Sequence, residues 1–132
     1  MKTVWLYLIA TVIFFAVDML WIGFVARGFY KDKLGYIMAD KPNWAAAVIF
    51  YLLYIGGILF FAVIPALRDQ SWTAALINGA VLGLLCYATY DLTNYATLAK
   101  WPFVVVVVDM LWGIFITAGV AIATYLIGNR IG

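Results

Sequence analysis

The chain has 132 residues, of which 68% are hydrophobic and 11% are charged, and its net charge is +2. This composition is typical of an integral membrane protein, and the small charge excess argues against nucleic-acid binding. With no histidine and one cysteine, the chain lacks the ligand sets of zinc, haem and iron–sulfur centres. No cofactor is therefore expected, and carboxylates are the only metal ligands left.

Four long apolar runs follow one another along the chain. A span takes about 20 apolar residues, so the length fits about four spans and no separate soluble domain. Each run is more than twice as long as a barrel strand and lacks strict alternation of polarity, which favours helix. We predict one all-α domain, residues 1–132, in which four transmembrane helices form an antiparallel bundle. The predicted spans are residues 4–26, 45–67, 74–98 and 103–128.

The connections between the runs differ in length. Residues 68–71 and 99–102 form short turns, whereas residues 27–44 form a long connection. Tyr30 and Leu34 in this connection have a helical spacing beside charged residues, which predicts an interfacial helix lying flat on the membrane. The membrane face with the long connection carries five of the eight lysines and arginines. The positive-inside rule therefore favours the cytoplasm for that face.

Three aspartates, Asp18, Asp91 and Asp109, lie inside apolar runs that contain no basic residue. An acid in hydrocarbon costs roughly 2.5–3.5 kcal/mol on insertion scales, and such residues usually have a function. Each aspartate lies nine residues from Arg27 or Lys100 at the face just described. At about 1.5 Å per residue, all three reach a depth of about 13 Å. We therefore predict one polar layer that faces the bundle interior.

Aromatic side chains accompany this layer. Tyr51 and Tyr54 of the second run reach a similar depth, and Tyr87 shares a helix face with Asp91 and Asn94. The pentapeptide Val-Asp-Met-Leu-Trp occurs at residues 17–21 and again at 108–112. Because these two helices are predicted to run in opposite directions, their tryptophans are expected to bracket the carboxyl groups. The predicted ligand- or proton-binding residues are Asp18, Asp91, Asp109, Trp21, Trp112, Tyr51, Tyr54, Tyr87, Tyr90 and Asn94.

Other features have structural interpretations. The GxxxG pattern of Gly79 and Gly83 permits close helix approach, and dimerisation through it is one of two alternatives. Cys86 is alone in the middle of a span and is predicted to be a small packing residue. Four tryptophans at the ends of runs are predicted to be interfacial anchors: Trp5, Trp44, Trp72 and Trp101.

The pattern of residues resembles a family of small bacterial membrane proteins known as domain of unknown function family 2177. The resemblance covers nearly the full length and implies a four-helix, multi-pass protein of the bacterial inner (cytoplasmic) membrane. It implies no activity. The stretches that carry it are residues 17–23, 29–35, 42–44, 50–54, 90–94, 96–98, 101–102 and 109–113.

Three functions remain open. The first is binding or transport of a cation or proton-coupled small molecule, since buried neighbouring carboxyl groups can exchange protons near neutral pH and aromatic rings can contact a cationic or lipophilic ligand. Four helices are few for a complete pathway, so this hypothesis favours a homodimer. The second is an intramembrane enzyme that acts on a lipid or isoprenoid through paired aspartates.

The third is a subunit of a membrane complex, in which the polar layer is a docking surface and the aspartates face lipid. A structural interpretation is also open. Each protonated aspartate would then hydrogen-bond a neighbour and fix helix packing, and each bond would stabilise the fold by about 0.6 kcal/mol. The direction in which the aspartates face separates an enclosed site from a docking surface.

Overall fold

The computed structural model describes residues 2–131, and four of its helices are long and apolar enough to cross a membrane. These helices pack together, and no strand occurs among residues 2–131. The all-α fold with four spans is thus confirmed. The first span joins α1 (Lys2–Leu20) to the π-helical η1 (Trp21–Val25), the second joins α3 (Trp44–Ile58), η2 (Leu59–Val63) and α4 (Ile64–Asp69), and the last two are α5 (Trp72–Thr97) and α6 (Phe103–Ile131).

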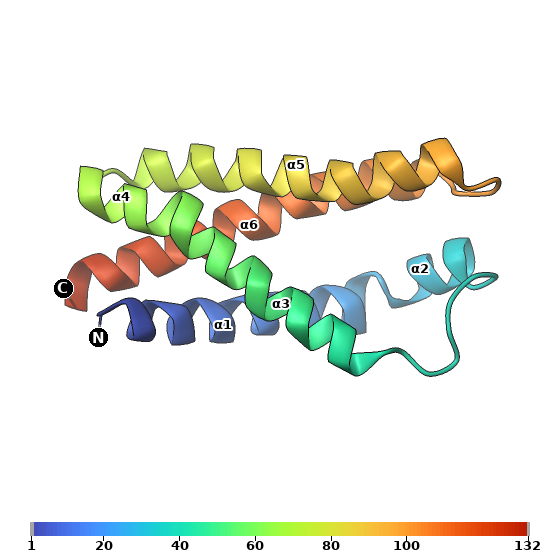
Figure 1. The fold of residues 1–132 in the computed structure, drawn as a ribbon, viewed down its shortest axis with the longest axis horizontal. Helices are drawn as coiled ribbons and strands as arrows, with labels where there is room; N and C mark the ends of the chain where they lie inside the picture. The colour runs from blue at the N-terminus through green and yellow to red at the C-terminus, as the bar shows by residue number, and fades with distance from the viewer. Residues whose placement is uncertain (1, 132) are drawn as a thin grey trace.

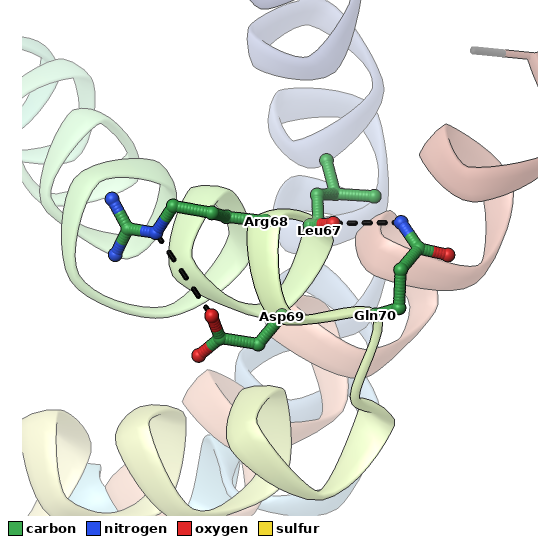
Figure 2. A network of polar contacts seen from close by, with 4 residues as sticks. All are labelled: Leu67, Arg68, Asp69 and Gln70. Carbon is green, nitrogen blue, oxygen red and sulfur yellow. Dashed lines mark hydrogen bonds and ion pairs between the residues drawn. The ribbon is translucent and has the colours of Figure 1, made fainter.

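The turn between α4 and α5 shows how the local sequence ends one span and starts the next. Gln70 adopts the left-handed conformation with φ of 51°, and its Nε2 donates to the Leu67 carbonyl at 2.7 Å (Figure 2). Ser71 then caps α5, since its hydroxyl oxygen accepts from the amide of Ala74 at 3.1 Å. These contacts satisfy backbone groups that a helix end leaves free.

The pair α5 and α6 forms the closest helix contact in the bundle. A Cβ atom at Gly83 would lie 2.1 Å from the carbonyl oxygen of Gly113, and one at Gly79 would lie 2.9 Å from the Cα of Ala118. Only glycine permits such backbone approach. Of the two alternatives for the GxxxG pattern, the structure therefore favours close packing within one chain, because α6 covers this face.

By contrast, α3 diverges from α5. In Figure 1, α4 lies beside the start of α5, and α3 runs obliquely from α4 across the bundle to α1. The second span contacts α5 through η2 and α4, whereas α3 packs on α1. The main core lies where α1, the second span and α6 meet, and Phe14, Ile55 and Ile116 are fully buried there. The amino-terminal part of α3 is left with one side open.

The long connection contains a further helix, α2 (Arg27–Leu34). It packs on the start of α6, where Leu34 contacts a small cluster that includes Trp101, Val105 and Val106. The Tyr36 hydroxyl also donates to the Lys100 carbonyl. In Figure 1 both termini lie at one end of the bundle, and α2 and the connection between α5 and α6 lie at the other. The end of the bundle opposite the termini is therefore in contact with α2 and the residues that follow it.

One of the four predicted tryptophan anchors is wrong. Trp5, Trp44 and Trp72 are largely exposed, as expected for anchors, but Trp101 is only 6% exposed. It is buried because Leu34 of α2 covers the cluster to which it belongs and Tyr90 packs edge-on against its ring. Its position at the end of a run gave no sign of this contact.

Candidate functional site

All three intramembrane aspartates face the interior. Asp18 is 4% exposed, Asp91 is not exposed at all, and Asp109 is 7% exposed. Two surface aspartates have cationic neighbours: Asp32 lies 3.7 Å from Lys33, and Asp69 lies 4.0 Å from Arg68 (Figure 2). Among residues 2–131, no buried aspartate forms an ion pair with a lysine or an arginine. The carboxyl groups inside the bundle must therefore be stabilised by protons, hydrogen bonds or a ligand.

Asp18 belongs to a cluster at the centre of the bundle. The Tyr51 hydroxyl donates to its Oδ2 at 3.1 Å, and the Trp112 indole lies beside the same carboxyl group. Phe14 and Phe15 hold the Tyr51 ring in place, with centroid distances of 5.7 and 5.2 Å. The first, second and fourth spans thus all contribute to this cluster.

Asp109 and Asp91 form a second cluster. The Tyr30 hydroxyl donates to Oδ1 of Asp109 and accepts from Nε1 of Trp21 at 3.3 Å. The Asp91 carboxyl group lies close enough to Asp109 and Trp101 for electrostatic interaction. The predicted single layer therefore consists of two clusters, one around Asp18 and one around the Asp91–Asp109 pair.

Asp91 is the most unusual member of this group. Among the described residues, neither of its carboxyl oxygens makes a hydrogen bond of acceptable geometry, and neither does the nearby Nε1 of Trp101. Buried polar atoms are nearly always hydrogen-bonded, because burial without a partner costs free energy. The two Asp91 oxygens are thus available to accept a proton or to bind a ligand, and the nearby Trp101 Nε1 is available to donate to a ligand.

The repeated pentapeptide connects the two clusters. The Trp21 and Trp112 rings stack with centroids 4.4 Å apart and an interplanar angle of 10°. Trp21 follows Asp18 in sequence but hydrogen-bonds within the Asp109 cluster, whereas Trp112 follows Asp109 but lies beside Asp18. The expectation that the two rings bracket a carboxyl layer is wrong. They stand face to face between the clusters.

Tyr30 lies outside the predicted spans and stays a hydrogen-bond donor over a wide pH range. Burial raises the pKa of its hydroxyl, and the hydrogen bond and negative charge of Asp109 raise that pKa further. Each of these effects disfavours the phenolate. α2 therefore contributes a neutral donor to a carboxyl group that arises from a span 79 residues further along the chain.

A cavity of about 380 Å³ opens between α3 and α5. Tyr87 lies within electrostatic range of both Asp18 and Asp109, and Tyr90 is 56% exposed. The cavity thus lies next to the Asp18 cluster and reaches the surface of the bundle. Its lining residues are Phe50, Tyr51, Cys86, Tyr87 and Tyr90.

Two predicted site residues, Tyr54 and Asn94, do not line the cavity, although the Tyr54 ring stacks on that of Phe50 with centroids 5.5 Å apart. Tyr54 is buried, and its hydroxyl lies 2.6 Å from Oγ1 of Thr117. Asn94 is half-buried, and no side-chain hydrogen bond involves it among the described residues. No three histidine, cysteine, aspartate or glutamate side chains within residues 2–131 converge in a metal-binding arrangement.

Sequence reasoning missed four residues of the site: Tyr30, Trp101, Phe50 and Cys86, the last of which was predicted to be a packing residue. Tyr30 was assigned to the helical spacing of the long connection, Trp101 was taken as an anchor, and Phe50 is one of nine phenylalanines with no distinguishing neighbour. The spacing that places Tyr30 and Leu34 on one helix face was the only signal for the contact between α2 and the bundle.

Comparison with known proteins identifies a family but no activity. The family described as predicted membrane protein, DUF2177, matches residues 3–126. A search of curated proteins and a search of solved structures gave no match. The chain therefore belongs to the DUF2177 family of predicted membrane proteins.

Proposed function

We propose that this member of the DUF2177 family exchanges protons at the Asp91–Asp109 pair and couples that exchange to the binding or transport of a small cationic or lipophilic ligand. The observation that carries the proposal is the fully buried Asp91 carboxyl group, which has no hydrogen-bond partner among the described residues and lies beside a second carboxyl group. Two carboxyl groups in contact titrate as a pair. A cation that binds to them competes with their shared proton.

The surroundings of the pair suit this role. Tyr30 donates to Asp109, which leaves Asp91 as the member that is free to gain or lose a proton. The stacked tryptophans connect the pair to Asp18. A change of charge at one cluster can therefore change the proton affinity of the carboxyl group in the other cluster. Carboxyl groups of this kind form the proton relays of pumps and transporters.

The proposed exchange can be measured directly as proton release. We expect purified protein in lipid nanodiscs to release protons near neutral pH when a cation is added from a panel of Na⁺, K⁺ and tetraphenylphosphonium. Asp91→Asn and Asp109→Asn should abolish the release, because an amide cannot carry the exchangeable proton. Asp69→Asn is the matched control, since Asp69 is a surface acid beside Arg68 and should leave the release unchanged.

The same experiment can contradict the proposal. Equal release from folded Asp91→Asn and wild-type protein would place the exchanging group elsewhere. The absence of release from folded wild-type protein over the whole panel would overturn proton exchange and would favour the structural or enzymatic interpretations.

The subunit hypothesis has less support. It requires the aspartates to face lipid or a partner, whereas all three are at most 7% exposed. The bundle would have to open before these side chains could contact a partner. The paired-aspartate enzyme needs a substrate pocket beside its carboxyl groups, and it would show turnover rather than cation-linked proton release in the assay above.

A further inference from the structure

The cavity between α3 and α5 is a feature separate from the Asp91–Asp109 pair. Its lining residues come from α3 and α5, and α3 diverges from α5 and packs on α1 (Figure 1). Two of its lining residues, Phe50 and Tyr90, are more than half exposed, whereas Tyr51 and Tyr87 are half-buried behind them. Phe50 lies six residues into its span, which is about 9 Å along the helix. The mouth of the cavity therefore faces the hydrocarbon region of the membrane.

The inner wall of the cavity is electronegative. Tyr51 both lines the cavity and donates its hydroxyl proton to Asp18 at 3.1 Å. This bond leaves the oxygen lone pairs of Tyr51 available and polarises the hydroxyl group. The lining contains four aromatic rings, whose faces attract cations, and no basic residue. The charge distribution favours a cationic guest.

The dimensions and access route limit the guest further. The cavity volume of about 380 Å³ falls within the range of small-molecule pockets. A guest that enters from the hydrocarbon region must carry its charge inside an apolar body, because a small hydrated ion would lose its hydration there. Both conditions are met by a compact organic cation with a delocalised or shielded charge.

We propose that the cavity lined by Phe50, Tyr51, Cys86, Tyr87 and Tyr90 binds a lipophilic organic cation that enters sideways from the membrane, with Asp18 supplying the negative charge. This assignment rests on the proposed function, because it names the ligand whose binding is linked to proton exchange. The link runs from Asp18 through the stacked pair Trp112 and Trp21 to Tyr30 and Asp109.

The test compares two probes of the same shape and opposite charge. Tetraphenylphosphonium should bind wild-type protein in nanodiscs, measured by equilibrium dialysis against empty nanodiscs, at least about tenfold more tightly than tetraphenylborate. Asp18→Asn should remove most of this preference. Equal binding of the two ions to the wild-type protein would reduce the cavity to an uncharged apolar groove and overturn the proposal.

A second comparison locates the bound ion. Cys86→Phe fills the cavity and should weaken tetraphenylphosphonium binding about tenfold or more. Leu85→Phe is the matched control, because the neighbouring Leu85 is 60% exposed and does not line the cavity, so binding should persist. Equal binding by these two variants would show that the ion binds elsewhere, which contradicts the proposal.

Wild-type protein provides a measurement that does not depend on any variant folding. Cys86 is the only cysteine in the chain and lines the cavity. Saturating tetraphenylphosphonium should slow its alkylation by N-ethylmaleimide, whereas tetraphenylborate should not. Unchanged alkylation at saturating tetraphenylphosphonium would overturn the assigned location.

The outcomes for this site and for the proton-exchanging pair can be distinguished. If Na⁺ or K⁺ releases protons through Asp91 and Asp109 but tetraphenylphosphonium does not bind, the cavity proposal fails and the proton exchange stands. If tetraphenylphosphonium binds in the cavity and protects Cys86 without any proton release, the cation site is supported and the coupled exchange fails.

Discussion

The hydroxyl group of Tyr51 is the donor that Asp18 uses from α3. Tyr51→Phe removes this donor and keeps the ring that packs on Phe14 and Phe15. We expect the free energy of unfolding in bicelles to fall by about 0.6 kcal/mol and by no more than about 1.7 kcal/mol, the range measured for side-chain hydrogen bonds in membranes. Tyr95→Phe on the surface of α5 should have no effect. A loss as large in this control would mean that Tyr51 contributes no specific bond.

The raised pKa of Tyr30, caused first by burial and then by Asp109, predicts a pH effect with a definite sign. The folded state holds the phenolic proton more tightly than the unfolded chain, whose tyrosines titrate near pH 10. The stability from Tyr30 is therefore fully present below about pH 10 and is lost as the pH rises through the raised pKa of the folded state.

The measurement is the difference in unfolding free energy between wild-type protein and Tyr30→Phe. This difference should be constant from pH 7 to about pH 9 and should narrow above about pH 10. Because both proteins share every other tyrosine, the comparison isolates Tyr30. A difference that widens at alkaline pH would contradict the assignment of Tyr30 as a neutral donor to Asp109.

Single residues were predictable from the sequence to the degree that their signal was local. An acid inside an apolar run is conspicuous, so Asp18, Asp91 and Asp109 could be identified and their inward placement anticipated. Tyr30 could not be placed in the site, because its partner Asp109 lies 79 residues away. Trp101 looked like an anchor because nothing in its neighbourhood showed that α2 packs over it.

At the scale of elements, the contact between α5 and α6 should be the least tolerant of added volume. Gly83→Ala would place a methyl group 2.1 Å from a backbone carbonyl oxygen of α6, which cannot move aside as a side chain can. We expect a loss of about 1–3 kcal/mol or more in unfolding free energy, as for other overpacked interiors. The measurement is denaturant unfolding in bicelles, followed by circular dichroism.

The control for this substitution lies on the facing helix. A Cβ atom at Gly119 of α6 would meet nothing within 4 Å. Gly119→Ala should therefore be neutral or stabilising by up to about 1 kcal/mol, because alanine is the better helix former. Similar losses of unfolding free energy for both substitutions would show that the close approach of α5 and α6 at Gly83 is not the cause of the destabilisation.

The number of helices that can span a membrane was predictable, but the internal irregularities of these helices were not. Apolar runs report where a chain can cross a membrane, and all four predicted runs correspond to candidate spans. The π-helical segments η1 and η2 change the backbone hydrogen bonding without changing composition. In η1 the amide of Ala26 donates to the Trp21 carbonyl at 2.7 Å. Such a turn has no signature in hydropathy.

At the scale of the whole molecule, the division into two carboxyl clusters predicts a pattern of energetic coupling. Asp91→Asn and Asp109→Asn each remove one member of the same coupled pair, so the stability change of the double variant should differ from the sum of the single changes by about 0.5–3 kcal/mol. Asp18 belongs to the other cluster. The coupling between Asp18→Asn and Asp91→Asn should be smaller than the coupling within the pair, because it acts only through the stacked tryptophans.

Unfolding free energies of the single and double variants in bicelles provide this test. A coupling of Asp18 to Asp91 as strong as that of Asp109 to Asp91, or additivity of Asp91 and Asp109, would contradict the division into two clusters. Counting residues gives the depth along each helix, but it does not show which neighbours the side chains meet. Tyr51, Tyr30 and the stacked tryptophans decide that grouping.

The glycine contact between α5 and α6 has a mechanical consequence. Two helices whose backbones already touch cannot approach further, and separating them would expose buried polar side chains to lipid, so they act as a fixed frame. α3 has no such attachment to α5 and is joined to α4 through the π turn of η2. We therefore expect a backbone motion that widens or narrows the cavity to be a swing of α3 about that turn, while the α5–α6 frame keeps Asp91 and Asp109 in place.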